Sequence, residues 1–388
     1  IHNTVLGPAL GGTRMWNYTN EWEALNDVLR LSRGMSYKNS ISGLNLGGGK
    51  AVIIGDAKTQ KTPELMTRFG QFVDSLSGKY ITAEDVGMET RDMDIVSEVT
   101  KHVAGISVER GGSGNPSPVT AYGVFVGMKA AAKYQFGSDN LEGKKVLVQG
   151  IGHVGEVLVQ HLTESGAIVT IADLNQDRLN EVGSKYGAKI YTGSDLYSAD
   201  VDIYAPCALG ATINDDTINK IQAKIIAGAA NNQLANEVTH GKLLKEKGIL
   251  YAPDFLINAG GVINVYSELV KWTNAQVMEK TENIYNTALE IFKFADDNNI
   301  TTHNKEYQES NKNIARCSLS GHLIGIFIII VFLFSIMYRS YTLVKTNKIK
   351  RTDFMSLYFI VTSILGSLIY LSDLFQDLAI EYNNLLDI

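Results

Sequence analysis

Short apolar runs alternate with helical stretches over residues 144–255. The run Lys145–Gln149 is rich in β-branched residues, and apolar positions recur after it at helical spacing, on the side that would face a sheet (Val157, Leu158, His161 and Leu162). A second run, AIVTIAD, ends at Asp173, and four further short runs follow at 189–192, 201–208, 224–230 and 249–255. This alternation predicts an α/β fold with a Rossmann-type doubly wound parallel sheet, whose ligands bind beyond the carboxyl ends of the strands.

The first 120 residues carry a different pattern, in which apolar runs adjoin charged residues. The run at 51–54 follows Lys50, and the run at 80–84 leads to Asp85. A turn is expected at Gly11 and Gly12, and the stretch GGSGNPSPVTAYGV at 111–124 predicts a hinge that leads into a helix. Because such charges could all be solvated surface groups, the pattern alone leaves their function open.

The hydrophobic pattern changes near residue 305, after which two long uncharged runs occupy 323–338 and 354–372. A membrane-spanning helix needs about 20 apolar residues, with a lower limit of about 17. We therefore expect a C-terminal hydrophobic helical hairpin with transmembrane helices at about 318–338 and 354–372. A pair of buried core helices is the alternative.

Composition limits the possible partners and the compartment. The chain has 388 residues, 45% of them hydrophobic, and a formal net charge of −6, which argues against a nucleic-acid partner. The two cysteines, Cys207 and Cys317, are far apart, so neither a disulfide framework nor a metal site is expected, and a reducing compartment fits. Because the chain begins with Ile1 and shows no signal peptide, we expect its natural start to be missing.

The stretch LNLGGGK at 44–50 places three glycines before a lysine, as phosphate-binding loops do. Such a loop needs a glycine five positions before its last glycine and a hydroxyl after the lysine. This chain has Leu44 and Ala51 at those positions, so the phosphate interpretation fails. Lys50 is then either a surface lysine after a turn or a residue with another function.

The nucleotide motif lies at GIGHVG, residues 150–155, between an apolar run and a helical stretch. Its glycines allow close approach of a pyrophosphate at a helix N-terminus, and we assign the cofactor loop to Gly150, Gly152, His153, Val154 and Gly155, with His153 facing solvent. Asp173, about 20 residues downstream, would accept hydrogen bonds from the ribose hydroxyls and favour NAD over NADP. A strand-end turn residue is the alternative for Asp173. Cys207 is expected to be a small buried residue near the cofactor, not a nucleophile.

Six segments carry a resemblance that runs from residue 1 to about 303: LGPALGGTRMW, LNLGGGKAVI, AEDVGM, GNPSPVTA, GIGHVG and NAGGVIN. In this order they resemble the glutamate/leucine/phenylalanine/valine dehydrogenase family, most closely its leucine-specific members. The resemblance implies an N-terminally truncated substrate domain at 1–119, a NAD-binding domain at 120–257, and helices returning toward the substrate domain at 258–304. It also implies a homo-oligomer and a cleft between the domains.

The resemblance further implies which residues act. Lys50 matches the catalytic lysine and Asp85 the carboxylate that exchanges protons with the substrate amine, a task best served by a pKa near the working pH. Lys38 matches the lysine that holds the substrate carboxylate, beside Gly12 and Met35. Near the nicotinamide, the matching positions are Thr120 and Asn231, and Asn258 matches one near both cofactor and substrate. The expected side-chain pocket is apolar: Leu10, Ala83, Val262 and Val265.

The implied reaction is the reversible NAD-dependent oxidative deamination of L-leucine and related branched-chain amino acids to 2-oxo acids and ammonium. Glutamate is not expected as substrate, since no Lys or Arg occurs among the pocket positions. A related valine or phenylalanine dehydrogenase stays open, as does a membrane-anchored NAD-binding protein without catalysis.

The tail from residue 305 to 388 departs from the family. The loop between its hydrophobic runs is basic (Arg339, Lys345, Lys348, Lys350 and Arg351), so the positive-inside rule places that loop in the cytoplasm. A hairpin would then put the dehydrogenase outside, away from NAD. We expect a cytoplasmic dehydrogenase joined to a foreign tail, with a genuine membrane anchor as the alternative.

Overall fold

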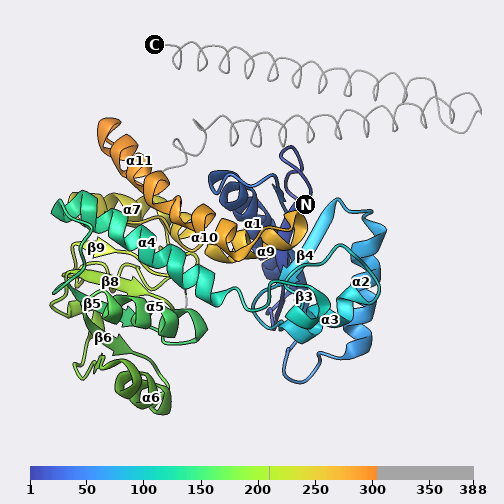
Figure 1. Cartoon of the computed structure of the whole chain (residues 1–388), viewed down its shortest axis with the longest axis horizontal. Helices are drawn as coiled ribbons and strands as arrows, with labels where there is room; N and C mark the ends of the chain where they lie inside the picture. The colour runs from blue at the N-terminus through green and yellow to red at the C-terminus, as the bar shows by residue number, and fades with distance from the viewer. Residues whose placement is uncertain (209, 304–388) are drawn as a thin grey trace, which may run out of the picture. The chain divides into compact units, whose positions relative to one another are not determined.

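The computed structural model describes residues 1–208 and 210–303, all of which belong to one compact unit. Two parallel sheets with flanking helices make up this unit, which confirms the α/β class (Figure 1). The expected hairpin at about 318–338 and 354–372 lies outside the described residues. Within 1–208 and 210–303, no helix is both long and apolar enough to cross a membrane.

The first sheet is built around strand β1 (Ala9–Trp16), which pairs in parallel with β4 (Tyr80–Glu84). Its other neighbours are β2 (Gly47–Gly48) and β3 (Ala51–Ile54), which keep one register along β1 and are separated only by two residues. The turn expected at Gly11 and Gly12 is wrong, because both lie inside β1. A Cβ on Gly12 would lie 2.3 Å from the Glu84 carbonyl oxygen, so the glycine permits close strand packing instead.

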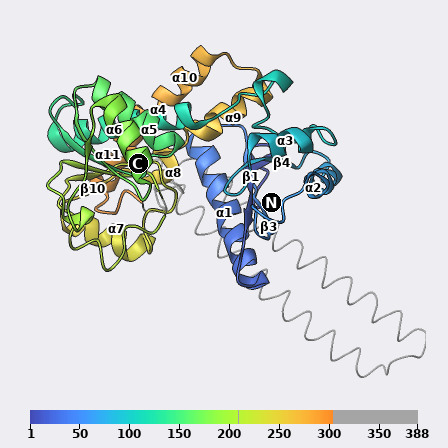
Figure 2. The same ribbon diagram turned by 90° about the horizontal axis from the view of Figure 1, so that it is seen from below.

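Helices cover both faces of this sheet. Helices α2 (Pro63–Ser75) and α3 (Thr90–Ser97) enclose one face around a cluster of buried side chains that includes Met15, Met66, Met93 and Val96. Helix α1 (Glu21–Ile41) runs along the strands on the side of β1 that lies away from α2 (Figure 2). Its first turn is capped by Asn20, whose side chain accepts a hydrogen bond from the Glu23 amide.

The second sheet has six parallel strands in the order β10-β9-β8-β5-β6-β7. Their bounds are β5 Lys145–Gln149, β6 Ile168–Ala172, β7 Lys189–Ile190, β8 Ile203–Pro206, β9 Ile225–Ile226 and β10 Leu250–Tyr251. Each predicted run contains one of these strands, although the last four runs are longer than the strands inside them. The chain continues from β5 to one side and later returns to its other side, which creates the switch point where such sheets bind ligands.

The remaining helices surround this second sheet or connect it to the first. They are α4 Ser117–Phe136, α5 His153–Glu164, α6 Gln176–Tyr186, α7 Glu237–Glu246, α8 Asp254–Ile257, α9 Gly260–Val270, α10 Asn274–Glu282 and α11 Ile284–Asp297, with short 3-10 helices at Val108–Arg110 and Leu196–Ser198. His161 does not face the sheet as expected. Its ring stacks on Phe125 of α4 at 5.4 Å between centroids.

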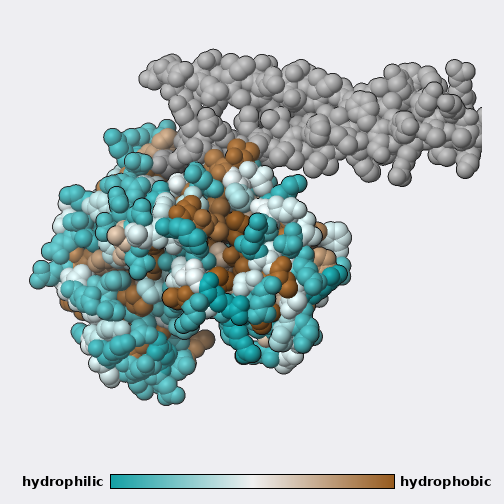
Figure 3. Space-filling view, turned by 45° about the vertical axis from the view of Figure 1, so that its right-hand side comes forward, coloured by the Kyte–Doolittle hydropathy of each residue, from teal (hydrophilic) through white to brown (hydrophobic). Residues whose placement is uncertain are grey.

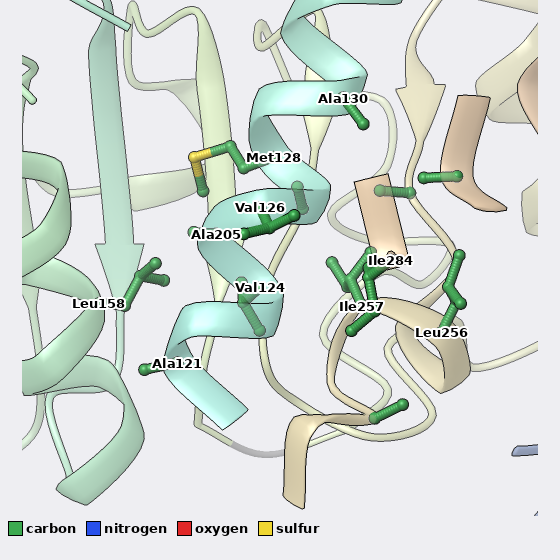
Figure 4. Packing of buried hydrophobic residues seen from close by; sticks show 14 of the residues in the cluster. Ala121, Val124, Val126, Met128, Ala130, Leu158, Ala205, Leu256, Ile257 and Ile284 are labelled. Atoms are coloured by element: carbon green, nitrogen blue, oxygen red, sulfur yellow. The ribbon is translucent and has the colours of Figure 1, made fainter. Parts of the chain in front are cut away.

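Helix α4 lies at the centre of the largest hydrophobic cluster, between Leu158 of α5 and the pair Ile257 and Ile284 (Figure 4). A Cβ on Gly127 of α4 would lie 2.3 Å from the Ile257 side chain, so the glycine allows these helices to approach closely. Leu10 and Ala83 from the first sheet belong to the same cluster. The two sheets therefore share one continuous core.

On the face seen in Figure 3, small hydrophobic groups are interspersed among hydrophilic residues. The largest exposed apolar side chains of helix α1 are Trp22, Leu25 and Leu29, whose spacing places them on one side of the helix.

Candidate active site

The alternation of β1 and β4 sorts their side chains onto two faces. Leu10, Gly12 and Arg14 alternate along β1 and share a face. Ala83 lies beside Gly12 in the parallel register, and Asp85 lies two residues further on, just after β4 ends. Polar and apolar candidates therefore share one face of the first sheet, with Leu10 near the start of β1 and Asp85 just beyond the carboxyl end of β4.

Lys50 and Asp85 form an ion pair, with 2.7 Å between Nζ and Oδ2. The Lys50 side chain is only 8% exposed. Burial alone would raise the pKa of Asp85, but Lys50 and Arg14 together hold that pKa below its ordinary value. The expectation that Asp85 has a pKa near the working pH is therefore wrong for this arrangement: its carboxyl group is ionised, because two cations face it.

Close packing explains why glycine occupies the three positions before Lys50, because a side chain at any of them would overlap neighbouring protein atoms. A Cβ on Gly48 would lie 2.1 Å from the Ser36 amide nitrogen of α1, and one on Gly47 would lie 2.0 Å from the Asn3 carbonyl oxygen. Gly49 faces the ring of Tyr80 in the same way, at 2.8 Å. They allow β2 to approach α1 and β4 closely, and Lys50 emerges where the β-ladder is interrupted.

Lys38, near the end of α1, contacts the second half of the molecule. Its Nζ donates hydrogen bonds to Asn258 Oδ1 at 2.7 Å and Asn231 Oδ1 at 3.2 Å. Asn258 in turn donates from Nδ2 to Asn231 Oδ1 at 2.8 Å and to the Ala229 carbonyl at 3.0 Å. Burial, with a contribution from nearby Lys50, lowers the pKa of Lys38 to about 8. Residues predicted from the two halves of the chain are thus brought together here.

Apolar candidates lie in one hydrophobic cluster. Leu10, Ala83, Val262 and Val265 are all buried, and Met35 packs against them partly buried. The helix that carries the two valines, α9, approaches α4 closely because of Gly260, whose added Cβ would lie 2.1 Å from the Val119 carbonyl oxygen. That approach brings Thr120 of α4 against Gly261, where an added Cβ would lie 2.8 Å from the Thr120 hydroxyl. The Thr120 hydroxyl donates to the Pro116 carbonyl at 2.9 Å.

The predicted cofactor loop has the backbone of a phosphate cradle. Gly150 has a positive φ of 93°, and a Cβ there would lie 2.7 Å from Ala208. One on Gly155 would lie 2.0 Å from the Gly150 carbonyl oxygen. At Gly152, by contrast, no heavy atom of the described residues beyond its two chain neighbours lies within 4 Å of an added Cβ, so the loop is open where a ligand would approach. Gly152 also precedes α5 without a side-chain cap among the described residues, which leaves the first-turn amides to a ligand.

Three other candidates lie around this loop. Asp173 accepts hydrogen bonds from the Ile151 amide at 2.8 Å and the Asn175 amide at 2.9 Å, so its carboxylate is held against the loop. His153 is exposed, and Val154 is partly buried. Burial raises the pKa of the Cys207 thiol to about 12, and its sulfur accepts a weak hydrogen bond from the Ala229 amide. The thiol is therefore protonated near neutral pH and no nucleophile. The open loop and the placed carboxylate fit a dinucleotide.

Two charged residues at the site were not predicted from the sequence. Arg14 forms ion pairs with Asp85 and Asp27. It belongs to the segment LGPALGGTRMW, and its position two residues after Gly12 could have indicated that it shares the face of that glycine. Glu268 of α9 accepts hydrogen bonds from the amides of Gly105 and Ser113 at 3.0 and 2.8 Å, which fixes the segment before α4. No local pattern marks Glu268, because its partners are about 160 residues away in the sequence.

A separate cavity of about 850 Å³ lies between α4, α10 and α11. Much of its polar lining is already paired: the Tyr122 hydroxyl donates to Glu282 at 2.8 Å, and the Tyr285 hydroxyl to Asp139 at 3.4 Å. None of the predicted site residues lines it.

The parallel sheets, the glycine loop and the charged cluster define an α/β protein in which one sheet carries the glycine loop and the other carries the charged residues. Residues 1–102 match the family of the Glu/Leu/Phe/Val dehydrogenase dimerisation domain, and residues 111–177 and 175–319 match Glutamate/Leucine/Phenylalanine/Valine dehydrogenase. The chain therefore belongs to this family and is an amino-acid dehydrogenase.

Individual relatives agree with this family. The chain is 57% identical to a leucine dehydrogenase of Bacillus subtilis over 285 residues, which cover 74% of this chain and 78% of that protein. It is 48% identical to a valine dehydrogenase of Streptomyces virginiae over 303 residues, 77% of this chain and 84% of that protein. The crystal structure of L-tryptophan dehydrogenase from Nostoc punctiforme superimposes with a TM-score of 0.72 at 44% identity, covering 82% of this chain and 91% of that one.

Proposed function

We propose that the protein catalyses the reversible, NAD-dependent oxidative deamination of L-leucine and related branched-chain amino acids. The observation that carries this proposal is the convergence of Lys38, Lys50 and Asp85 from three separate segments, next to the carboxyl ends of the nucleotide-binding strands. Five leucine dehydrogenases at 51–57% identity support leucine as the substrate. The match of residues 1–102 to a dimerisation domain supports a homo-oligomer.

The second sheet would hold the cofactor. The open backbone at Gly152 and the uncapped amides of α5 suit the pyrophosphate, and Asp173 would exchange its bond with the Ile151 amide for bonds to the ribose hydroxyls. A carboxylate at that position repels a 2′-phosphate, which favours NAD over NADP. When bound, the nicotinamide accepts the hydride from the substrate Cα.

Lys38 would bind the substrate carboxylate. Its ammonium group is buried and held by Asn231 and Asn258, so it is already oriented before the substrate arrives. The substrate carboxylate beside it would offset the loss of solvation that burial causes, and would therefore raise the pKa of Lys38. This contact places the substrate Cα near Lys50 and Asp85.

The Lys50–Asp85 pair would move the protons. Asp85, ionised in the free enzyme, takes a proton from the substrate ammonium, so that the amine lone pair can assist loss of hydride from Cα. After hydride transfer, Asp85 releases that proton to solvent. As water adds to the iminium carbon, Lys50 passes one of its protons to Asp85 and takes one from the water, which leaves a neutral carbinolamine. The Lys50 ammonium group then donates a hydrogen bond to the carbinolamine oxygen. Asp85 gives its proton to the amine nitrogen, and the hydroxyl proton leaves with the ammonia as ammonium.

Side-chain specificity would come from Leu10, Ala83, Val262 and Val265. They form an apolar lining without a cation for a second carboxylate, which disfavours glutamate. One methylene is worth about 1–3 kcal/mol in such a pocket, so leucine, isoleucine and valine should differ by moderate factors. Phenylalanine should be a poorer substrate because its ring exceeds the volume left by leucine and valine side chains.

The test is an NADH absorbance assay on the full chain, with leucine, isoleucine, valine, phenylalanine and glutamate as parallel substrates, each with NAD and with NADP. We expect the three branched-chain amino acids to be oxidised with NAD at higher kcat/KM than phenylalanine, and glutamate not at all. The exposed-site variant Lys58→Ala is a matched control that should leave these ratios unchanged. Preference for phenylalanine, glutamate or NADP would contradict the assignment, and absence of turnover with NADH still bound would indicate a binding protein.

A further inference from the structure

Arg14 links the proposed acid–base pair to a second carboxylate. Its Nε donates to Asp85 Oδ2 at 3.2 Å, the same oxygen that Lys50 approaches at 2.7 Å. Its Nη1 donates to Asp27 Oδ2 at 3.0 Å, and that oxygen also accepts the Tyr18 hydroxyl at 2.6 Å. One planar guanidinium therefore connects the site to helix α1 and to the loop before it.

The arrangement fixes the direction in which Arg14 points. Lysine could reach one carboxylate, but the rigid fork of arginine can bond two at once. Asp27 lies in the second turn of α1, a helix whose far end carries Lys38. Both ends of α1 thus contribute to the same polar cluster.

The charge of Arg14 is permanent, whereas that of Lys50 is not. During deamination, the ammonium group of Lys50 exchanges protons with the substrate oxygen, so its attraction for Asp85 varies. An arginine does not lose its proton in proteins. With Arg14 in place, Asp85 keeps one cation at Oδ2 at every stage of the cycle.

We propose that Arg14, oriented by Asp27 and Tyr18, is a positioning residue that keeps Asp85 aimed at the reacting amine, and ionised whenever it is to accept a proton, whatever the protonation state of Lys50. This role rests on the proposed amino-acid deamination, because it concerns the proton acceptor of that reaction. Arg14 acts through Asp85 and does not itself contact the substrate.

Other ionisable groups around Asp85 act from a greater distance. Lys38 of α1 and Tyr80 of β4 both interact electrostatically with Asp85. Burial raises the pKa of Tyr80 to about 12, so its hydroxyl is neutral near pH 7. Asp27 and Tyr18 face Arg14, and burial, together with Asp27, raises the pKa of Tyr18 above its ordinary range. Among residues 1–208 and 210–303, Lys50 and Arg14 are thus the two cations in direct contact with the Asp85 carboxylate.

The test measures ionisation of Asp85 directly in Arg14→Gln, by ¹³C NMR of the labelled aspartate carboxyl groups, with Asp85→Asn used to assign the signal. Loss of an opposite charge at this distance shifts a carboxyl pKa by about 1–3 units. We therefore expect Asp85 in Arg14→Gln to titrate at least about one unit higher than in the wild type. The acid limb of kcat/KM should move by the same amount and in the same direction.

Two further variants keep the test decisive if Arg14→Gln folds poorly. Arg14→Lys retains the charge without the fork, so the Asp85 titration should stay near that of the wild type while kcat falls. Tyr18→Phe should lower kcat by less and should leave the pH at which Asp85 titrates unchanged. Arg110→Gln, which removes exposed ion pairs to Asp94 and Glu98, is the matched control and should change neither.

An Asp85 signal that titrates at the same pH in Arg14→Gln and in the wild type would overturn the role of Arg14. So would an Arg14→Gln enzyme that loses stability and turnover without any shift of the acid limb. The NMR titration needs no turnover. Suppose that the wild type shows no dehydrogenase activity but that the Asp85 signal still titrates at a higher pH in Arg14→Gln. The proposed function would then be refuted, and the electrostatic role of Arg14 would remain.

Discussion

The two sheets organise their functional residues in opposite ways. In the six-stranded sheet, the proposed phosphate cradle lies within Gly150–Gly155, and only Asp173 joins it from further along the chain. In the sheet around β1, the charged cluster is assembled from separate segments that contribute Arg14, Lys38, Lys50 and Asp85. One substitution at a glycine can disturb the local turn, whereas the assembled cluster depends on the register of several strands.

Glycine has a related structural role in both sheets but a different functional one. Gly155 lets α5 approach the loop that would hold a ligand, since its added Cβ would meet the Gly150 carbonyl. Gly48 lets β2 approach α1, so that Lys50 is presented by a closely packed backbone. Glycine thus serves packing in both sheets, and in the second sheet it packs the loop that we propose binds the cofactor. Substitutions in the two sheets should separate catalysis from cofactor affinity.

Lys50→Ala should show the largest effect and should be confined to catalysis. We expect kcat to fall by about 10²–10⁴-fold, as is usual when a general acid–base group is removed. NADH affinity, measured by fluorescence titration, should change little, because the proposed cofactor loop belongs to the other sheet.

The control for this variant is Lys58→Ala, which removes an exposed lysine in the turn after β3 and should retain wild-type turnover. A Lys50→Ala enzyme that keeps more than about a tenth of wild-type turnover would show that the acid–base assignment is wrong. Loss of NADH binding in the same variant would show that the two sheets are not functionally separable.

The same contrast explains how much the sequence could predict. The second sheet was predicted strand by strand, because period, glycine spacing and the acid at 173 are local features. In the first sheet, Lys38, Lys50 and Asp85 were selected only through resemblance to a family. The local sequence pattern predicted a turn at Gly11 and Gly12. Two adjacent glycines occur both in turns and in closely packed strands, so the sequence alone does not distinguish the two. Arg14 was missed because its partners, Asp27 and Asp85, become neighbours only after folding.

Gly155→Val should produce the opposite pattern to Lys50→Ala. The added side chain would displace the loop, because a Cβ on Gly155 would lie only 2.0 Å from the Gly150 carbonyl oxygen. A displacement of about 1 Å at a functional site can lower the reaction rate by about 10²-fold, and we take the same order for binding. We expect NADH affinity to fall by about that factor, while unfolding free energy falls by about 1–3 kcal/mol from overpacking.

Gly34→Ala is the matched glycine control, because no described atom outside its chain neighbours and the backbone of α1 lies within 4 Å of its added Cβ. Alanine inside a helix should stabilise the protein by about 0.5–1 kcal/mol and leave NADH binding unchanged. If Gly155→Val binds NADH as the wild type does, the dinucleotide assignment of this loop fails.

Asp173→Ala should weaken NAD binding more moderately. Hydrogen bonds to a charged group contribute about 1.5–3 kcal/mol, so we expect the dissociation constant of NADH to rise by roughly 10–100-fold. The ratio of NADP to NAD turnover should rise as well, because the repulsion of a 2′-phosphate is removed. An unchanged ratio would indicate that Asp173 serves only the loop, through the Ile151 amide.

The smallest effect concerns pH, and it tests whether Lys38 binds a carboxylate. Because the pKa of Lys38 is lowered to about 8, its ammonium form predominates below that pH and declines above it. Inhibition by 4-methylpentanoate, which has the leucine side chain and carboxylate but no amine, isolates this contact from titration of the substrate. Its inhibition constant should be constant below about pH 8 and rise about tenfold per unit above it.

Lys38→Arg distinguishes loss of charge from loss of fit. An arginine stays charged across this range, so its inhibition constant should be higher than that of the wild type but independent of pH. Protein stability provides a second measurement. The unfolded chain binds the Lys38 proton more tightly than the folded chain does. The contribution of Lys38 to the free energy of unfolding therefore increases as pH rises from about 8 to 10.5. A wild-type inhibition constant that stays flat to pH 9.5 would remove Lys38 from carboxylate binding. The charged cluster of the first sheet would then serve proton transfer alone, and the substrate carboxylate would need another partner.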